Sequence, residues 1–231
     1  MVSLRLLGRR IGRTGAIVIA IALTGVVVWT LALSWRPSDT DYVFQGVDVS
    51  AAQGKIQWPT VMASGADFAY LRATMGATGR DDRFAANWGD THASGIRRGA
   101  IHVWSFCQLA ADQANNFNTT VPYADDALPA AIYLEFAEDC AARPARDVVV
   151  SEVKRFITMV ESHTRKPVLL KIAQPVEAAY QLSASVPRPI WSMQNFFPPD
   201  YAARPWRMWQ ASDMRRIDGV EGPVHWNVVA P

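Results

Sequence analysis

Histidine and cysteine are scarce in this sequence. It contains four histidines and two cysteines among 231 residues, and they do not stand at the short spacings typical of metal ligands. The sequence also has no Gly-x-Ser-x-Gly elbow, no phosphate-cradling glycine loop and no dinucleotide fingerprint. These absences exclude the familiar signatures of serine hydrolases, phosphate-loop enzymes and nicotinamide enzymes. We therefore expect neither a metal ion nor another cofactor.

A large excess of charge of one sign is also missing. Lysine and arginine together number 23 against 21 acidic residues, which gives a formal net charge of +2. Several arginines precede residue 44, so the remainder of the chain is slightly acidic. Domains that bind nucleic acid usually present a strongly basic surface. Nucleic acid is therefore not the expected partner.

Charged residues are absent from one long apolar run near the N-terminus, GAIVIAIALTGVVVWTLALS at residues 15–34. As a helix, this run is long enough to cross the roughly 30 Å hydrocarbon core of a bilayer. Four arginines precede it and only Arg36 follows closely. The positive-inside rule then places the N-terminus in the cytoplasm and the rest of the chain in the periplasm. We expect a single-pass protein of the inner membrane.

The same run also admits a second interpretation, a cleaved signal peptide with a small-x-small site at Ala32-Leu33-Ser34. The run is longer than the apolar core of a usual signal peptide, which favours an anchor that stays attached. The expected organisation is a cytoplasmic basic segment at residues 1–14, a transmembrane signal-anchor at 15–34, a linker at 35–43 and one domain at 44–231.

The predicted domain alternates short apolar runs with longer helical stretches. The runs have the length, the residue types and the flanking glycines or prolines of buried strands. They cover residues 44–50, 67–73, 99–105, 130–135, 168–173, 189–194 and 206–211, with helices expected at 82–96, 110–121 and 146–163. Strand and helix in alternation predict a parallel sheet. Because helices give way to short strands toward the C-terminus, we expect an α/β fold, an irregular TIM-like barrel.

Barrels of this kind carry their chemistry at the C-terminal ends of the strands. Several polar residues stand at these ends in the predicted barrel. They are Asp48, Arg72, His102, Glu135, Lys171 and Gln210, together with the segment around His225. We expect the functional residues among them.

Several stretches resemble, in the same order, the strands of family 25 glycoside hydrolases, the lysozymes that cut peptidoglycan. The segment GVDVS at 46–50 resembles the opening strand of the family, and FAYLRAT at 68–74 resembles the second. Similar matches follow at GAIH (99–102) and Trp209-Gln210, and Asn227 ends a segment like the family's closing Asp-x-Asn. Matches in this order extend from residue 46 nearly to the end of the chain. They point to the family's barrel more strongly than any single short motif does.

The resemblance implies a muramidase that hydrolyses the β-1,4 bond between N-acetylmuramic acid and N-acetylglucosamine in peptidoglycan glycan strands. It assigns Glu135 as the catalytic acid/base and Asp48 as an assisting carboxylate. Six further residues are implied as substrate-binding: Tyr133, His102, Gln210, Trp209, Asn227 and Arg72. With nine tryptophans in the chain, Trp209 could equally belong to the core. No protein partner can be inferred.

The sequence departs from the family pattern at three acidic positions. Tyr133 replaces the aspartate of an Asp-x-Glu pair, Met75 replaces a glutamate, and His225 replaces the aspartate of the closing motif. Glycoside hydrolysis ordinarily needs two carboxyl groups, one of which holds its proton. Two hypotheses follow: a muramidase of impaired activity, or a catalytically silent module (a pseudoenzyme) that binds peptidoglycan or acts as a scaffold in the cell envelope.

The two cysteines, Cys107 and Cys140, each lie shortly after a predicted strand. If those strands are neighbours, the sulfur atoms could meet, and an oxidising compartment would permit a disulfide. Such a bridge would contribute about 3–4 kcal/mol to stability by the loop-entropy estimate. Two free thiols remain the alternative.

Overall fold

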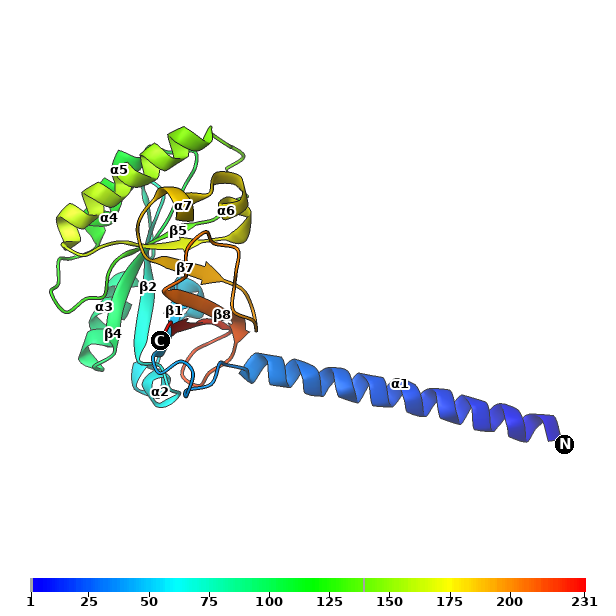
Figure 1. Ribbon diagram of the computed structural model, residues 1–231. Coiled ribbons are helices and arrows are strands. Elements are labelled where there is room, and N and C mark those ends of the chain that lie inside the picture. The colour runs from blue at the N-terminus through cyan, green and yellow to red at the C-terminus, as the bar shows by residue number, and fades with distance from the viewer. Residues whose placement is uncertain (1, 139) are drawn as a thin grey trace. The chain divides into compact units, whose positions relative to one another are not determined.

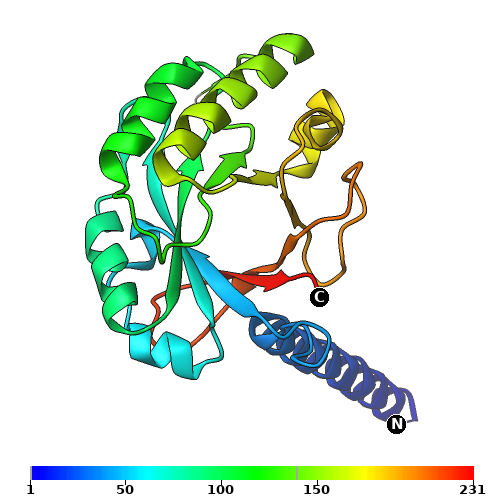
Figure 2. The same ribbon diagram turned by 60° about the vertical axis from the view of Figure 1, so that its left-hand side comes forward.

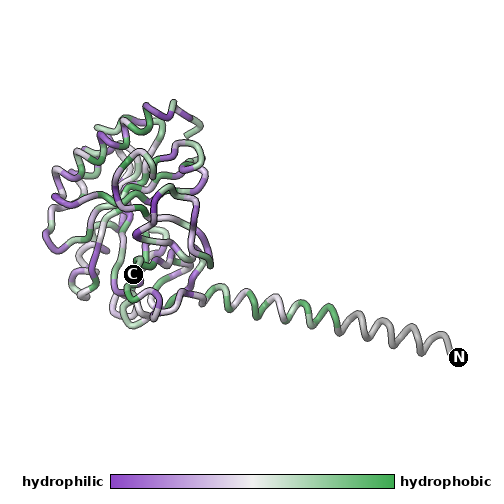
Figure 3. Tube along the Cα trace, viewed as in Figure 1, coloured by the Kyte–Doolittle hydropathy of each residue, from purple (hydrophilic) through white to green (hydrophobic). Residues whose placement is uncertain are grey.

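The computed structural model describes residues 2–138 and 140–231, which divide into two compact units, Met1–Trp35 and Arg36–Pro231. Helix α1 (Val2–Ser34) makes up nearly all of the first unit (Figure 1). Its segment Ile17–Ser34 has a mean hydropathy of 2.4 and is long and apolar enough to span a membrane. Figure 3 shows the hydrophobic colouring of this segment. The apolar run of the sequence is therefore one exposed helix and not part of a protein core.

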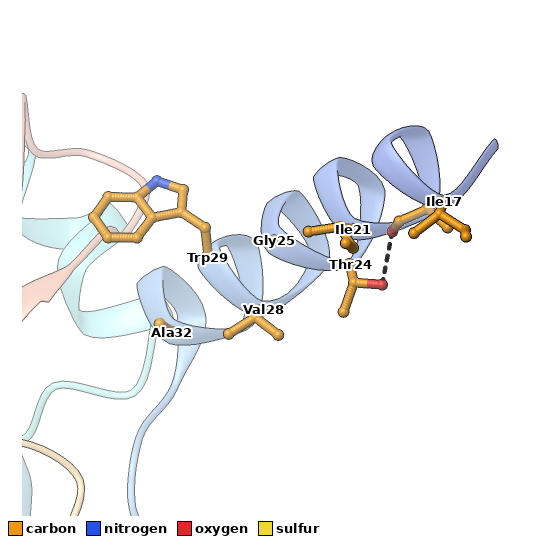
Figure 4. A pocket seen from close by; sticks show the side chains of 8 residues that line it. Ile17, Ile21, Thr24, Gly25, Val28, Trp29 and Ala32 are labelled. Atoms are coloured by element: carbon orange, nitrogen blue, oxygen red, sulfur yellow. Dashed lines mark hydrogen bonds between the residues drawn. The ribbon is translucent and has the colours of Figure 1, made fainter. Parts of the chain in front are cut away.

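One side of α1 carries a shallow groove lined by Ile17, Ile21, Thr24, Gly25, Val28, Trp29 and Ala32, among others (Figure 4). The Thr24 hydroxyl donates to the Ala20 carbonyl one turn earlier, at 2.9 Å. This bond satisfies the only hydroxyl that the groove presents. The surface is otherwise apolar, as expected for a helix in contact with lipid.

The second unit is a closed barrel of eight strands. In order around the barrel they are β1 (Gln45–Val49), β2 (Phe68–Met75), β4 (Arg97–Val103), β5 (Ala131–Leu134), β6 (Leu169–Ile172), β7 (Ile190–Met193), β8 (Met208–Arg215) and β9 (Val224–Val229). Strands β1 to β8 pair in parallel, whereas β9 closes the barrel antiparallel to both β8 and β1. The short strand β3 (Gly79–Arg80) forms a hairpin with the end of β2. The predicted irregular barrel is confirmed.

Helices cover the outside of the barrel unevenly, as Figure 2 shows. The long helices are α3 (Phe84–Ala93), α4 (Ala110–Thr120) and α5 (Arg146–Thr164), and shorter ones are α2 (Trp58–Ala63), α6 (Gln174–Tyr180), α7 (Leu182–Ser185) and the 3-10 turn η1 (Ala51–Gln53). Helix α5 buries Val149, Val153, Phe156, Ile157 and Val160, the face that its periodicity predicts. No long helix follows β7, so the C-terminal strands have less helical cover.

Aromatic and aliphatic side chains from six strands meet inside the barrel. This cluster consists of Phe68, Tyr70, Ile101, Ala131, Leu169, Trp191 and Met208. Two glycines make room for its rings: a Cβ atom on Gly46 would overlap Phe68, and one on Gly99 would overlap Tyr70. These side chains pack against one another in the half of the barrel nearer the N-terminal ends of the strands. Polar side chains are found toward the C-terminal ends.

Part of the predicted linker at 35–43 packs against the barrel. Pro37 is buried, and the Gln45 side chain donates to the Pro37 carbonyl at 3.1 Å. The Tyr42 ring lies 6.2 Å from that of Trp206 and 5.8 Å from that of Trp209. The boundary between the units falls between Trp35 and Arg36. Most of this segment thus belongs to the folded domain.

Candidate active site

A buried ion pair stands at the C-terminal end of the barrel. Asp48 on β1 is 8% exposed and Lys171 on β6 is fully buried. The Lys171 Nζ atom donates to Asp48 Oδ2 at 2.9 Å. The two residues are 123 positions apart in the chain and meet across the barrel interior.

Strand β9 supplies two more partners of the same carboxylate. Asn227 Nδ2 donates to Asp48 Oδ2 at 3.0 Å, and His225 Nδ1 lies 2.8 Å from Asp48 Oδ1. The Asn227 side-chain oxygen accepts in turn from the Trp191 indole at 3.1 Å. Both Asp48 oxygens are therefore engaged. The register pairs Asp48 with His225, which explains why the antiparallel β9 can reach this end of the barrel.

The electrostatics of the pair follow from burial and charge together. Burial alone would raise the pKa of Asp48, but the charges and hydrogen bonds of Lys171 and His225 outweigh it and hold that pKa well below its usual range. Burial lowers the pKa of Lys171, and the Asp48 carboxylate opposes this shift. Asp48 is thus an ionised carboxylate whose charge is already compensated.

Tyr133 and Glu135 lie beside this pair. The Tyr133 hydroxyl donates to Glu135 Oε2 at 2.5 Å, and Glu135 itself is exposed. The Lys171 Nζ atom sits 5.0 Å from the centroid of the Tyr133 ring, within the range of a cation–π contact. Burial and the neighbouring Glu135 carboxylate raise the pKa of Tyr133 far above its usual value. Tyr133 therefore remains a neutral phenol and does not replace an acidic group.

Two further predicted residues lie at the same end of the barrel. Gln210 on β8 pairs in register with Asn227 and is 7% exposed. Its side-chain Oε1 is buried and has no hydrogen-bond partner among the described residues. Arg72 on β2 is held by Asp81 through an ion pair of 2.9 Å, and Asp81 also accepts from the Ala51 backbone N–H at 2.8 Å. Arg72 is therefore restrained at the rim.

His102 does not join this cluster, which corrects its assignment as a substrate-binding residue. Its ring is fully buried and stacks 4.7 Å from that of Phe156 on α5. Thr74 Oγ1 at 2.7 Å and Gln113 Oε1 at 3.1 Å engage its two nitrogens. Burial lowers the pKa of His102 to about 4. The residue is a neutral packing element between the barrel and its helices.

Trp209 is likewise placed away from the cluster. It is 1% exposed, its indole donates to the Gln194 carbonyl at 2.6 Å, and its ring packs with Tyr42 and Trp206. The structure thus supports the core interpretation of this tryptophan. Trp191 is fully buried and contacts the ion pair, with its ring centroid 4.3 Å from Lys171 Nζ.

Cys107 and Cys140 form a disulfide in the structure, with Cα atoms 5.9 Å apart. The bridge joins the loop after β4 to the loop after β5, which begins at Glu135. It therefore restrains the segment that carries Glu135. Among the described residues no group of three or more histidine, cysteine, aspartate or glutamate side chains could hold a metal ion.

Comparison with known proteins now adds to this geometry. Residues 47–220 match the model of glycosyl hydrolases family 25. A curated relative, the uncharacterized protein YegX of Escherichia coli K12, is 31% identical over 195 residues, which cover 81% of this chain and 70% of the relative. The chain therefore belongs to glycosyl hydrolases family 25.

Solved structures agree with this assignment. A family 25 glycosyl hydrolase from Bacillus anthracis is 30% identical, with a TM-score of 0.77 over 84% of this chain and 91% of that one. The bacterial lysozyme from Streptomyces coelicolor is 26% identical, with a TM-score of 0.72 over 80% and 91%. The barrel of the chain is thus that of family 25 glycosyl hydrolases.

Proposed function

We propose that this protein binds peptidoglycan glycan strands at the C-terminal end of the barrel and hydrolyses them weakly or not at all. One observation carries the proposal. The Asp48 carboxylate is neutralised by Lys171 and engaged by His225 and Asn227, while the position two residues before Glu135 holds a phenol. This group of residues therefore offers polar atoms to a sugar, but Asp48 does not act as a second free anion beside Glu135.

The chemistry of glycoside cleavage explains the expected loss of activity. One group must protonate the leaving oxygen, and another must stabilise the developing positive charge at the sugar carbon. Tyr133 is neutral and cannot provide that stabilisation as an anion.

Features that support glycan binding remain in place. Gln210 Oε1 is buried without a partner among the described residues, and Arg72 is held at the rim by Asp81. Buried polar atoms without partners are costly, so a ligand that donates a hydrogen bond to Gln210 would gain affinity. Sugar hydroxyls and acetamido N–H groups are suitable donors.

For the setting, we propose that α1 anchors the protein in the inner membrane, with the N-terminus in the cytoplasm and the barrel in the periplasm. The apolar segment Ile17–Ser34 and the preceding arginines support this orientation. The disulfide is in keeping with an oxidising compartment. Protease added to spheroplasts should digest the barrel, whereas a barrel that resists protease until the inner membrane is opened would reverse the assignment.

The functional test uses the full chain in mild detergent with purified sacculi. We expect the unaltered protein to sediment with sacculi and to release no muropeptides above background, and Glu135→Gln to behave in the same way. In the double variant Tyr133→Asp/Lys171→Met, Asp48 and the carboxylate introduced at position 133 would lie near Glu135 without the Lys171 counter-ion. Muropeptide release should therefore appear. Adding Glu135→Gln to that variant should abolish the release.

The control for charge removal is Lys154→Met, because this lysine is exposed on α5. This substitution should leave both the sedimentation with sacculi and the muropeptide release unchanged. Muropeptide release by the unaltered protein that disappears in Glu135→Gln would instead establish an active muramidase. Failure of the folded protein to sediment with sacculi would contradict glycan binding.

A further inference from the structure

A second cavity opens at the opposite end of the barrel from the candidate site. Its volume is about 620 Å³, within the range of small-molecule sites. Residues at the N-terminal ends of the strands line it, including Phe44, Phe68, Tyr70, Leu128, Leu169 and Met208. All of them belong to the unit Arg36–Pro231, so the barrel alone forms this cavity.

The cavity has an apolar interior and a basic rim. Phe68, Tyr70, Leu169 and Met208 belong to the interior cluster of the barrel and are at most 5% exposed. The only polar atom that Tyr70 offers, its hydroxyl, already donates to the Pro129 carbonyl at 3.0 Å. These side chains form the floor, and the accessible apolar lining comes from Phe44, which is 54% exposed, and from the partly buried Leu128 and Val229. This surface favours a hydrocarbon chain over a sugar or a peptide backbone.

The rim carries two exposed arginines, Arg97 at the start of β4 and Arg207 just before β8. Within the described part of the chain, neither guanidinium forms an ion pair; Arg207 only donates to the Ala230 carbonyl at 3.3 Å. Asp67 is the acidic residue of the lining, and one of its oxygens already accepts the Gln45 backbone N–H at 3.0 Å. The mouth is thus positive on balance.

We propose that this cavity binds a single acyl chain with an anionic head group. The chain would lie against Phe44, Leu128 and Val229, above the floor of buried side chains, and the head group would meet Arg97 and Arg207. Arginine suits both carboxylate and phosphate oxygens. A free fatty acid and a lysophospholipid share this chemistry.

The test uses the full chain in nanodiscs with photoactivatable diazirine fatty acid, followed by mass spectrometry of the labelled peptides. We expect label on peptides that contain Phe44, Leu128 or Met208, in addition to label on α1. Arg97→Gln/Arg207→Gln should reduce the barrel label about tenfold, the change expected for about 1.4 kcal/mol of binding energy. Leu128→Trp, which narrows the mouth, should reduce it as well.

Label on α1 serves as the internal reference in every sample. The matched control is Arg155→Gln/Arg216→Gln, which removes two exposed arginines outside the cavity and should leave the barrel label unchanged. A photoactivatable lysophosphatidylglycerol is the second arm, and the stronger label of the two identifies the source of the chain. Three outcomes would overturn the proposal. They are labelling of the barrel that persists in Arg97→Gln/Arg207→Gln, equal labelling of the barrel by a neutral diazirine alcohol, and labelling confined to α1.

Discussion

At the scale of single residues, the Asp48–Lys171 pair dominates the candidate site. A buried ion pair contributes little net stability, but removing one partner leaves an uncompensated charge. We expect Lys171→Met to lower the free energy of unfolding by about 3–5 kcal/mol. Urea titration followed by circular dichroism measures this change.

A double-mutant cycle separates the pair from side effects of packing. Asp48→Asn/Lys171→Met removes both charges, so its loss of stability should be clearly smaller than the sum of the two single losses. His225 and Asn227 retain polar contacts with the new amide. Additive losses would mean that the two side chains do not form an ion pair in solution.

The buried ring of His102 predicts a pH dependence of stability. Its pKa is lowered from 6.5 to about 4 by burial, so the folded protein keeps the ring neutral while the unfolded chain takes up a proton. The contribution of neutral His102 to the free energy of unfolding is complete above about pH 6.5 and is lost as the pH falls toward 4. It amounts to about 3 kcal/mol. His102→Gln should lose less stability over this range. Denaturation at several pH values compares the two proteins, and parallel curves would refute the assignment.

The expectation that functional residues stand at the C-terminal ends of the strands pointed to Asp48, Glu135 and Gln210, which the structure places at one end of the barrel. The same expectation was wrong for His102, which lies away from them. Neighbouring residues of a strand face opposite sides, and Ile101 belongs to the interior cluster, so His102 points out toward the helices. That alternation could have been recognised in the sequence. The contact between Lys171 and Asp48 could not have been predicted, because the pairing of strands alone does not determine which side chains meet across a barrel.

At the scale of elements, the segment before β1 behaves as part of the domain. Tyr42 packs against Trp206 and Trp209, and aromatic pairs of this kind contribute about 0.5–1.5 kcal/mol each. We expect Tyr42→Ala to lower the melting temperature measurably. Asp41→Ala, the exposed neighbour, should leave it unchanged. Equal melting temperatures for both variants would mean that the segment is not docked.

The disulfide gives a prediction for the loops around Glu135. The unreduced, unfolded protein should show no free thiol, and reduction should cost about 3–4 kcal/mol of stability. Cys107→Ser/Cys140→Ser should match the reduced protein and should not respond to reductant. Two titratable thiols in protein purified without reductant would contradict the bridge.

All seven strands expected from apolar runs are present, and so are the three long helices. Strand β9 is hard to delimit from the sequence, because its apolar residues alternate with His225 and Asn227 and several prolines precede it. The short helices α2, α6 and α7 also went unrecognised. They span only four to seven residues, too few to display a helical period.

At the scale of the whole molecule, the alternation of strands and helices was enough to predict the barrel, and the family comparison agrees with it. The activity could not be predicted in the same way, because a fold does not determine its chemistry. The contacts among Asp48, Lys171 and His225 and the neighbouring Tyr133 come from four strands, β1, β5, β6 and β9, that meet only once the barrel has closed.

The antiparallel pairing of β1 with β9 sets an order of events during biosynthesis. Strand β1 has Val228 of strand β9 as a partner, so its pairing cannot be completed until β9 has been made. Contacts between such distant segments form slowly. A polypeptide that is threaded through a translocation channel would therefore cross unfolded, and the barrel would assemble only after β9 had emerged.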